Sequence, residues 1–232
     1  MQFPQPLARG RLVRRYKRFF ADVVLDGGEP VTAHIANPGK LLGLLAEDAV
    51  CWLSRSGAPG RKLAWSVELI EAEGGAPVAV NTALANRLAA EGVESVPALA
   101  GYATPRREVR YGSGRIDLLL EGGGRPPCWV EVKSVTLSRR PGLAEWPDCV
   151  SSRSSRQLRE LAEVVERGER AVLFFVLGRS DCTRFSPAAD LDPAFAAALA
   201  TAQAAGVEVL CHAADVSPRG LTLAGPLPIL PA

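Results

Sequence analysis

Residues 171–177 form an uninterrupted apolar run, Ala-Val-Leu-Phe-Phe-Val-Leu, between Arg170 and Gly178. A strand with one face in water alternates apolar and polar side chains, so a continuous run predicts a strand that is buried on both faces. Helical patterns flank this run in sequence: 154–168 carries apolar residues at helical spacing, and 192–206 begins with Asp-Pro and ends with Gly. This part of the chain is therefore predicted to be a mixed α/β domain with the run at the centre of its sheet.

The first third of the chain shows a different pattern. From residue 12 to about residue 82, short strand-like segments alternate with turns such as 26–28 (Asp-Gly-Gly), and no long helical repeat appears. Several short strands at this spacing predict a small β-barrel, for which the OB-fold is the leading candidate. Asn81 and Thr82 resemble the cap of a following helix, so we place two domains, 1–82 and 83–232. The predicted fold class is mixed α/β, an OB-like barrel followed by a mixed-sheet domain.

The positive charges of the chain are concentrated near its N-terminus. The formal net charge is only +2, but six of the ten residues from 9 to 18 are Lys or Arg and none is acidic. Such a cluster attracts polyanions through phosphate contacts and counterion release. A solvated strand face explains the cluster equally well, and charge alone does not separate the two interpretations.

Export, membrane and thiol functions find little support in the sequence. The N-terminal segment is basic but has no apolar stretch behind it, and 193–207 is too weakly apolar to span a bilayer. We therefore expect a cytoplasmic protein with no membrane partner. The five cysteines are scattered and there are two histidines, so we expect reduced, structural thiols and neither a cysteine nucleophile nor a zinc site.

The residues with the strongest chemical meaning are two carboxylates and a lysine. Asp117 is followed, after 13 intervening residues, by Glu131, Val132 and Lys133. On a strand Glu131 and Lys133 point the same way, and a hairpin would bring Asp117 opposite them. Taken alone, Glu-Val-Lys is more often an ordinary exposed pair. Asp117 changes that balance, because it lies in the apolar segment Ile-Asp-Leu-Leu-Leu and would be costly to bury without a partner.

This triplet predicts a metal-dependent phosphodiesterase site of the PD-(D/E)xK type. The carboxylates of Asp117 and Glu131, the Val132 carbonyl and waters suit a hard cation such as Mg²⁺, for which Mn²⁺ can substitute. Lys133 would orient or deprotonate the attacking water, or stabilise the charge that develops during phosphoryl transfer.

Two further residues are weaker candidates for the same site. Glu108 is a possible additional carboxylate, although a surface Glu balanced by neighbouring arginines is the favoured interpretation. Gln157 lies in the first turn of the predicted helix over 154–168, and a polar contact to the site and an exposed side chain explain it equally well.

Nucleic-acid contacts are predicted on the barrel. Cations interleaved with rings are typical of single-strand binders, which combine phosphate contacts with base stacking. The candidates in the basic cluster are Arg14, Arg15, Tyr16, Lys17 and Arg18. Phe19 and Phe20 are interpreted as barrel core instead. Weaker candidates, on or beside predicted loops, are Lys40, Arg61 and Lys62.

Several segments together resemble the sugar fermentation stimulation protein family of bacteria and archaea. They cover almost the whole chain in order, and include PLARGRLVRRYKRFF, VTAHIANPGKLLGL, REVRYGSGRIDLLL and WVEVKSVTL. The resemblance implies an N-terminal OB-like domain, a PD-(D/E)xK restriction-endonuclease-like domain and a DNA-binding role. It also maps the catalytic triplet onto Asp117, Glu131 and Lys133.

Two segments depart from the pattern of that family. Residues 37–41 read Asn-Pro-Gly-Lys-Leu where relatives usually read Asn-Thr-Gly-Ser-Met, which adds a rigid turn and a positive charge. Gln157 stands where relatives usually carry His, which keeps a hydrogen-bonding group and removes a titratable one. If that His acts as an acid or base, activity is altered in this chain.

Three functional hypotheses follow. The leading one is a Mg²⁺- or Mn²⁺-dependent nuclease that grips DNA, single- or double-stranded, with its basic barrel and cleaves it at the triplet. The alternative is a DNA-binding transcriptional regulator of sugar metabolism whose nuclease fold is catalytically silent. A sugar-binding protein has the weakest support, because no pocket motif or phosphate-cradling Gly loop is present. The oligomeric state stays open, with a homodimer among the alternatives.

Overall fold

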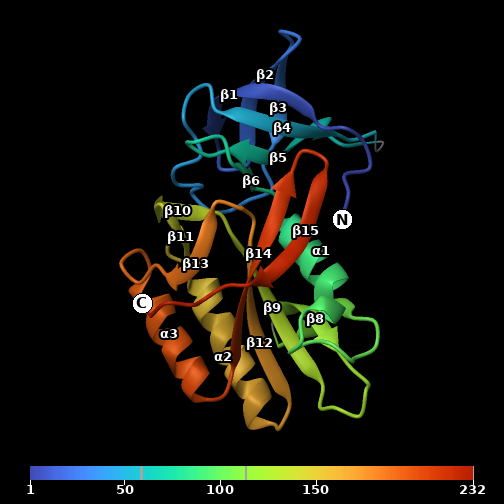
Figure 1. The fold of residues 1–232 in the computed structure, drawn as a ribbon, viewed down its shortest axis with the longest axis vertical. Coiled ribbons are helices and arrows are strands. Elements are labelled where there is room, and N and C mark those ends of the chain that lie inside the picture. The colour runs from blue at the N-terminus through green and yellow to red at the C-terminus, as the bar shows by residue number, and fades with distance from the viewer. Residues whose placement is uncertain (58–59, 113, 232) are drawn as a thin grey trace.

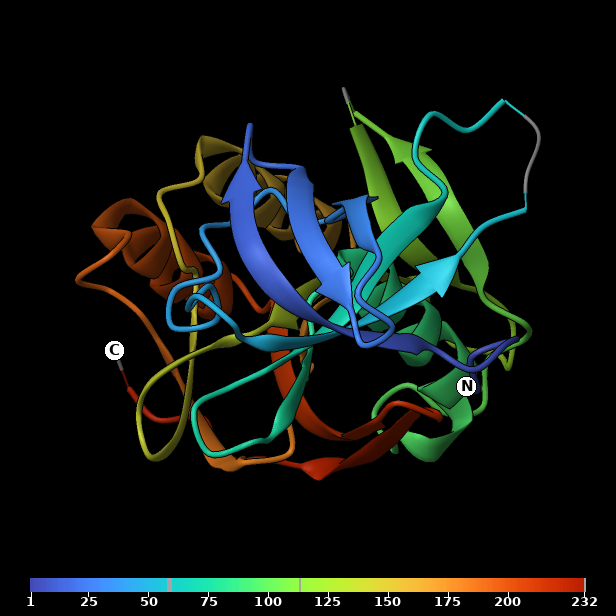
Figure 2. The same ribbon diagram turned by 90° about the horizontal axis from the view of Figure 1, so that it is seen from above.

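The computed structural model describes every residue of the chain except 58–59, 113 and 232. A small β-barrel stands on a mixed sheet that carries helices on both faces (Figure 1). Seen from above, the barrel overlies one end of that sheet (Figure 2). The predicted fold class is confirmed. No helix within the described part of the chain combines the length and apolar character needed to cross a membrane.

Six strands build the barrel domain. Their order is β3-β2-β1-β4-β5-β6, and a parallel pairing of Ala33 on β3 with Trp65 on β5 closes the barrel. The predicted turn at 26–28 joins β2 to β3, with Gly28 at a φ of +84° that other residues disfavour. The strands are β1 (Ala8–Tyr16), β2 (Phe20–Leu25), β3 (Pro30–His34), β4 (Val50–Arg55), β5 (Trp65–Glu71) and β6 (Pro77–Ala79).

Side-chain alternation along these strands creates the barrel core. On β2, for example, Ala21 and Val23 are buried while Asp22 between them is not. The buried core residues are Leu12, Ala21, Val23, Ala33, Ile35, Leu41, Leu44, Cys51, Leu53, Val67, Ile70, Val78 and Val80.

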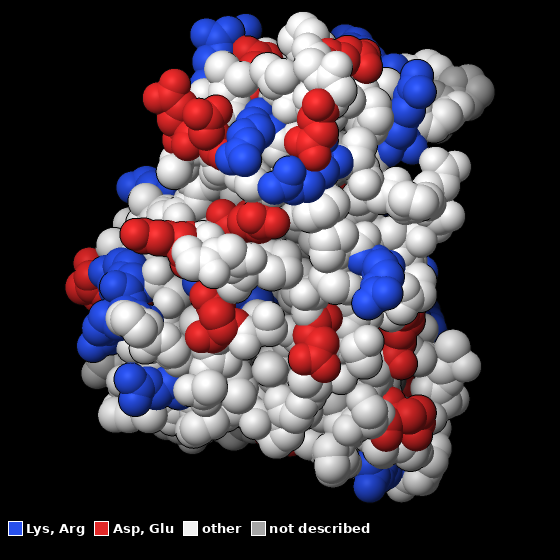
Figure 3. All heavy atoms as spheres, turned by 45° about the horizontal axis from the view of Figure 1, so that its top comes forward, with Lys and Arg blue, Asp and Glu red and all other residues white. Residues whose placement is uncertain are grey.

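The basic N-terminal cluster is partly neutralised by acids from the neighbouring strand. β2 pairs antiparallel with β1, which brings Asp22 to 2.8 Å from Arg14 and Asp26 to 3.2 Å from Arg9. Acidic and basic side chains are interspersed on the face drawn in Figure 3. The cluster is therefore less positive than its linear sequence suggests.

The second domain is built on a six-stranded mixed sheet with the order β15-β14-β12-β9-β8-β7. β12 contains the apolar run and pairs in parallel with β9 on one side and β14 on the other, so its predicted central position is confirmed. The strands of this sheet are β7 (Arg106–Tyr111), β8 (Gly114–Leu120), β9 (Cys128–Val135), β12 (Arg170–Leu177), β14 (Glu208–Ser217) and β15 (Gly220–Pro226). A separate small sheet contains β10 (Leu137–Arg140), β11 (Gly142–Trp146) and β13 (Cys182–Pro187).

Helices cover both faces of the mixed sheet. α1 (Thr82–Gly92), followed by the 3₁₀ turn η1 (Val93–Ser95), packs on one face, and α2 (Ser152–Glu166) and α3 (Pro193–Ala204) pack on the other. Asn81 and Asp192 cap α1 and α3 as predicted, because each side chain accepts a hydrogen bond from a backbone amide of the first turn. The predicted division after residue 82 falls at the first residue of α1.

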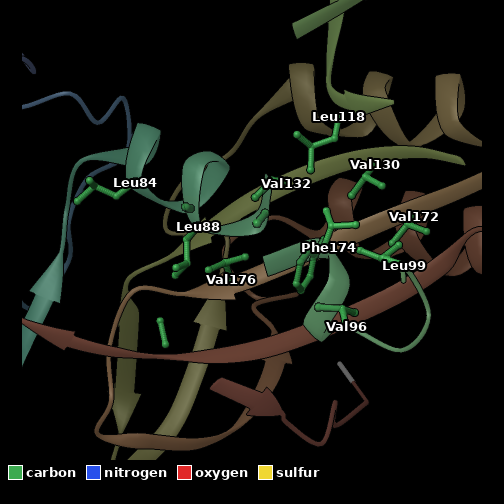
Figure 4. Packing of buried hydrophobic residues seen from close by; sticks show 14 of the residues in the cluster. Leu84, Leu88, Val96, Leu99, Leu118, Val130, Val132, Val172, Phe174 and Val176 are labelled. Carbon is green, nitrogen blue, oxygen red and sulfur yellow. The ribbon is translucent and has the colours of Figure 1, made fainter. Parts of the chain in front are cut away.

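The two faces carry separate apolar clusters. The cluster beneath α1 is shown in Figure 4, where the labelled side chains are Leu84, Leu88, Val96, Leu99, Leu118, Val130, Val132, Val172, Phe174 and Val176. The cluster beneath α2 and α3 contains Ile116, Val135, Leu158, Leu161, Leu173, Phe175 and Phe195. Large apolar side chains on both sides of β12 explain why its sequence shows no polar alternation.

Three segments have a structure that the sequence patterns above do not define. Residues 107–120 contain two strands, β7 and β8, with Ser113 between them outside the described residues. Residues 128–137 contain β9 and the first residue of β10. The Gly- and Pro-rich tail from Pro218 includes β15, which pairs with β14 and buries Leu221. Amino-acid composition does not predict this strand, because its conformation is stabilised by pairing with β14.

Candidate active site

Two neighbouring strands supply the three predicted catalytic side chains. Glu131 and Lys133 both bond to Gln157 on α2, whereas Val132 between them packs beneath α1. The ladder between β8 and β9 ends at the pair Leu118–Val130, so the preceding residue on β8, Asp117, lies next to Glu131. The structure thus brings the predicted triplet together.

The Asp117 carboxylate is held from two elements. Its Oδ2 accepts a 2.8 Å hydrogen bond from the Val132 amide on β9, and its Oδ1 accepts a 2.6 Å hydrogen bond from the Asn86 side chain on α1. The strand also changes face at this point, because Ile116 packs beneath α2 and Leu118 packs beneath α1. Asp117 therefore occupies a defined position where regular strand pairing stops.

Glu131 is buried and has one oxygen without a partner. Its Oε1 accepts hydrogen bonds from Lys133 Nζ at 2.8 Å and from Gln157 Nε2 at 2.5 Å. Its Oε2 is buried and has no hydrogen-bond partner among the described residues. A buried charged oxygen without a partner is strongly unfavourable, so this atom marks a position for a cation or another donor.

Lys133 keeps one donor for a ligand. Its Nζ donates to Glu131 and also, at 2.8 Å, to Gln157 Oε1, and it lies 5.6 Å from the centroid of the Trp146 ring. An ammonium group has three N–H donors, and these two bonds use two of them. Lys133 also lines an open cleft, so its third N–H can reach a bound molecule there.

Burial raises the pKa of Asp117 to about 7, and the nearby Glu131 carboxylate adds to the increase. The hydrogen bond from the Val132 amide and the charge of Lys133 act in the opposite direction. The site therefore encloses two carboxylates that repel each other. A divalent cation between them would remove that repulsion.

The donor atoms fit a hard divalent cation. Besides Asp117 and Glu131, the Val132 carbonyl is available, because the N–H and C=O of one strand residue point to the same side and the ladder with β8 has ended there. Within the described ranges, no group of three or more His, Cys, Asp or Glu residues forms a metal cluster. A cation here would thus have two carboxylates, one carbonyl and waters, which suits Mg²⁺ better than Zn²⁺.

Gln157 and Glu108 differ in their position relative to the predicted triplet: Gln157 is buried against it, whereas Glu108 is exposed. Gln157 is 5% exposed and bonds to both Glu131 and Lys133, so its interpretation as an exposed residue is wrong. It lies in the second turn because α2 begins at Ser152, earlier than predicted. Glu108 is exposed, lines the cleft and has a left-handed backbone with φ +53°. In the described part of the chain, no arginine forms an ion pair with it.

A cleft of about 560 Å³ opens over these residues, between the two domains. The mixed-sheet domain supplies the floor, and the barrel supplies Arg18 and the loop 37–39. A third side comes from the segment 145–154, which runs from the end of β11 into α2. The triplet therefore lies beneath residues of the other domain rather than on an open surface.

Arg15 and Asp148 hold the barrel side of the cleft in place. The Arg15 guanidinium donates to the carbonyls of Arg18 at 2.7 Å, Asn37 at 2.8 Å and Gly39 at 2.8 Å. Burial lowers the pKa of Arg15. Asp148 Oδ2 accepts a 2.7 Å hydrogen bond from the Leu41 amide. Arg15, which the sequence predicts to contact nucleic acid, thus also links the turn at Arg18 to the loop 37–39.

The other predicted contacts of the basic hairpin are partly engaged within the barrel. Arg14 pairs with Asp22 and lies 5.1 Å from the centroid of the Tyr16 ring. Tyr16 also donates to Asp22 and stacks on Phe20 at 5.6 Å. Phe19 is 38% exposed and stacks on His34, so its interpretation as barrel core is wrong.

The remaining predicted cations differ in their access to the cleft. Arg61 donates to the Ser66 hydroxyl. No ion pair is formed, within the residues described, by the exposed side chains of Lys17, Arg18, Lys40 and Lys62. Of the eight residues predicted to bind nucleic acid, Arg18 alone lines the cleft.

Several cleft residues escape sequence reasoning. Asn86 has a weak signal, because Asn is unfavourable inside a helix and its position in α1 therefore calls for a reason. The sequence carries no such signal for Trp146, Asp148 and Arg153. These residues reach the cleft only through the path of the chain from β11 into α2.

Comparisons with known proteins agree with this arrangement of domains. Residues 13–80 match the family model of the SfsA N-terminal OB domain, and residues 83–220 match that of the sugar fermentation stimulation protein RE domain. Among similar proteins, a sugar fermentation stimulation protein homolog of Maricaulis maris is 53% identical over 230 residues, covering 98% of this chain and 97% of the relative. A sugar fermentation stimulation protein homolog of Caulobacter vibrioides is 50% identical over 227 residues, covering 97% of this chain and 95% of the relative.

A solved structure has the same fold along the whole chain. It is the structure of Pyrococcus furiosus SfsA in complex with Ca²⁺, with a TM-score of 0.90 and 27% sequence identity. The match covers 99% of this chain and 98% of that one.

Proposed function

The chain belongs to the sugar fermentation stimulation protein family, and from this membership and its buried site we propose that it is a Mg²⁺- or Mn²⁺-dependent nuclease that hydrolyses DNA phosphodiester bonds. The observation that carries the proposal is Glu131 Oε2, a buried carboxylate oxygen with no partner among the described residues, beside the half-buried carboxylate of Asp117. Leaving such an oxygen unpaired is unfavourable, and a cation bound there would remove the penalty.

The related Pyrococcus furiosus structure supports a hard cation. That protein is described in complex with Ca²⁺, an ion that prefers oxygen ligands as Mg²⁺ does. In this chain Asp117, Glu131 and the Val132 carbonyl would hold the ion. When bound, a divalent cation polarises a phosphate oxygen and lowers the pKa of a bound water, which favours hydrolysis.

The remaining roles belong to side chains of the site. Lys133 directs its third N–H toward the cleft and would stabilise negative charge on a phosphate oxygen through a charge-assisted hydrogen bond. Gln157 positions Lys133 and Glu131, and Asn86 positions Asp117. The loop 37–39 forms part of the barrel side of the cleft.

A second candidate is a DNA-binding regulator whose nuclease fold is silent. It is favoured by the Glu131–Lys133–Gln157 triangle, in which the lysine is already paired before any substrate is present. A buried ion pair of this kind is also a common structural feature.

Hydrolysis of labelled DNA separates the two candidates. Single- and double-stranded DNA would be incubated with Mg²⁺ or Mn²⁺ and the wild type, Lys133→Ala, Glu131→Gln, or the exposed control Arg219→Ala. The nuclease proposal expects metal-dependent cleavage that falls at least about 100-fold in both site variants and is unchanged in the control. Cleavage that persists in the site variants would contradict the assignment of catalysis to this site. Absence of cleavage in the wild type, with DNA still bound, would favour the silent regulator.

A further inference from the structure

Two arginines from different domains line the cleft without being engaged elsewhere. Arg18 belongs to the barrel and Arg153 to the beginning of α2, and both side chains are exposed. In the part of the chain that the structure describes, neither forms an ion pair or donates a side-chain hydrogen bond. Most other cleft cations and acids are paired, so these two charges are available to a ligand.

Arg18 is presented by a rigid turn. Lys17 and Arg18 both adopt left-handed backbone conformations, with φ of 45° and 66°, between the paired residues Tyr16 and Phe20. Such conformations are unfavourable for side-chain-bearing residues and persist only where neighbours hold them. Arg15 does so here, because it bonds to the Arg18 carbonyl and to the loop 37–39 at once.

Arg153 is presented by the helix that also carries Gln157. Residues four apart lie on the same face of a helix, and Gln157 bonds to Glu131 and Lys133 at the cleft floor. Arg153 is thus one turn above the catalytic centre, on the side of the cleft formed by the mixed-sheet domain.

We infer that this cleft takes single-stranded DNA, with Arg18 and Arg153 binding backbone phosphates on either side of the one that reaches Glu131 and Lys133. The inference rests on the proposed function for the chemistry at the floor, but the binding mode is separate from turnover. Alternating cations along a groove are how proteins hold a strand without reading its sequence.

The dimensions of the cleft favour a single strand over a duplex. A volume of about 560 Å³ is in the range, roughly 300–1,000 Å³, that encloses a ligand of one or two nucleotides. Glu131 and Lys133 are 4% and 8% exposed at its floor. A duplex presents its phosphates on a wide, stiff cylinder, which cannot bring one to such a depth unless a strand leaves the helix.

The barrel loops add to this restriction. Asp148 bonds to the Leu41 amide, and Arg15 bonds to the Asn37 and Gly39 carbonyls, so the loop above the floor is tied to both domains. Opening the cleft to the width of a duplex by separating the domains would break the hydrogen bond between Asp148 and Leu41. A flexible strand needs no such opening.

Fluorescence anisotropy with a labelled 12-nucleotide oligo(dT) and a blunt 12-base-pair duplex tests the inference. Measurements in EDTA prevent metal-dependent turnover. The variants are Arg18→Ala and Arg153→Ala. Their matched controls are Arg11→Ala, an exposed barrel arginine, and Arg156→Ala, which lies on α2 and pairs with Glu160; neither control residue lines the cleft.

The single strand is expected to bind at least about tenfold more tightly than the duplex. Each cleft variant should weaken single-strand binding about fivefold and reduce the slope of log K against log salt concentration by about 0.7, the loss of one phosphate contact. Both controls should stay within about twofold. Equal affinity for the duplex, or equal losses in the control variants, would overturn the inference.

These outcomes are independent of those for the proposed function. A protein that binds oligo(dT) through Arg18 and Arg153 but never cleaves it keeps the binding inference and loses the nuclease proposal. A protein that cleaves through Lys133 but binds duplex equally well keeps the nuclease proposal and loses this inference.

Discussion

Asp148 of the mixed-sheet domain accepts a 2.7 Å hydrogen bond from the backbone amide of Leu41 in the barrel, 107 residues earlier in the chain. The contact is close because Gly39 has no side chain. A Cβ at that position would lie 2.6 Å from both Asp148 carboxylate oxygens, which is closer than such atoms approach. The contact joins the two domains directly beside the cleft.

Replacing Gly39 tests whether this contact stabilises the protein. Gly39→Ala should displace the Asp148 carboxylate and break its bond to Leu41, lowering the free energy of unfolding by about 1–2 kcal/mol. Urea denaturation measures the change. Gly27→Ala is the control, because no atom lies within 4 Å of a Cβ there and its φ is not positive, so a change within about 0.5 kcal/mol is expected. Similar losses in both variants would contradict the proposed contact.

Asp117 should make the metal-free protein less stable as pH rises. Its pKa is about 7 in the folded protein against an ordinary 3.8, so the folded state binds the proton more tightly across that interval. Stability from this group is complete below about pH 4, falls as pH increases toward 7, and changes little above it. Asp117→Asn removes the effect and should raise the free energy of unfolding at pH 8 by about 1–2 kcal/mol, with a smaller gain at pH 4.

Denaturation of wild type and Asp117→Asn in EDTA at pH 4, 6 and 8 measures this difference. In Mn²⁺ the order at pH 8 should reverse, because the cation binds the wild-type carboxylate and displaces its proton. Exposed Asp26→Asn serves as the control. An Asp117→Asn variant that is less stable than the wild type at pH 8 in EDTA would show that the carboxylate is not destabilising.

Gln157 should contribute to stability as well as to the geometry of the site. Gln157→Leu leaves Glu131 and Lys133 each with one partner fewer in a buried position, which should lower the free energy of unfolding by about 1–3 kcal/mol. Thermal denaturation in EDTA measures it without any contribution from a metal. Gln203→Leu, an exposed Gln on α3, should stay near the wild type. A neutral or stabilising Gln157→Leu would mean that the ion pair does not need the amide.

Arg15→Lys should loosen the barrel side of the cleft. A lysine ammonium cannot reproduce the planar fork that reaches three carbonyls at once, although it preserves the charge. Single-strand affinity is expected to fall about threefold or more, with a loss of stability of about 1–2 kcal/mol. Arg11→Lys, at an arginine with one backbone contact to Asp48, is the control. Unchanged binding in Arg15→Lys would show that the loops keep their positions without the fork.

Much of the fold follows from local patterns in the sequence. The buried strand β12, the caps of α1 and α3 and the barrel are all predicted, because each depends on neighbouring residues that are close in sequence. The tail from Pro218 is not predicted as β15, since its strand conformation depends on pairing with β14. The small sheet is missed for the same reason.

The candidate site divides in a similar way. Asp117, Glu131 and Lys133 are predicted together because strand alternation and a hairpin bring them near each other. The hydrogen bonds of Arg15 within the protein are not predicted. The carbonyls that it contacts belong to a loop, and sequence patterns do not define the path of that loop. The same holds for Asn86, whose contact with Asp117 spans 31 positions.

The contact between Gly39 and Asp148 has a consequence for how these domains are inherited. A side chain at position 39 is acceptable only if residue 148 withdraws, and residue 148 is useful only while position 39 leaves room for it. A substitution at either position alone therefore removes the hydrogen bond between residue 148 and the Leu41 amide. A chimera can combine the barrel of one relative with the mixed-sheet domain of another. It keeps this contact between the domains only when the two parts carry compatible residues at positions 39 and 148.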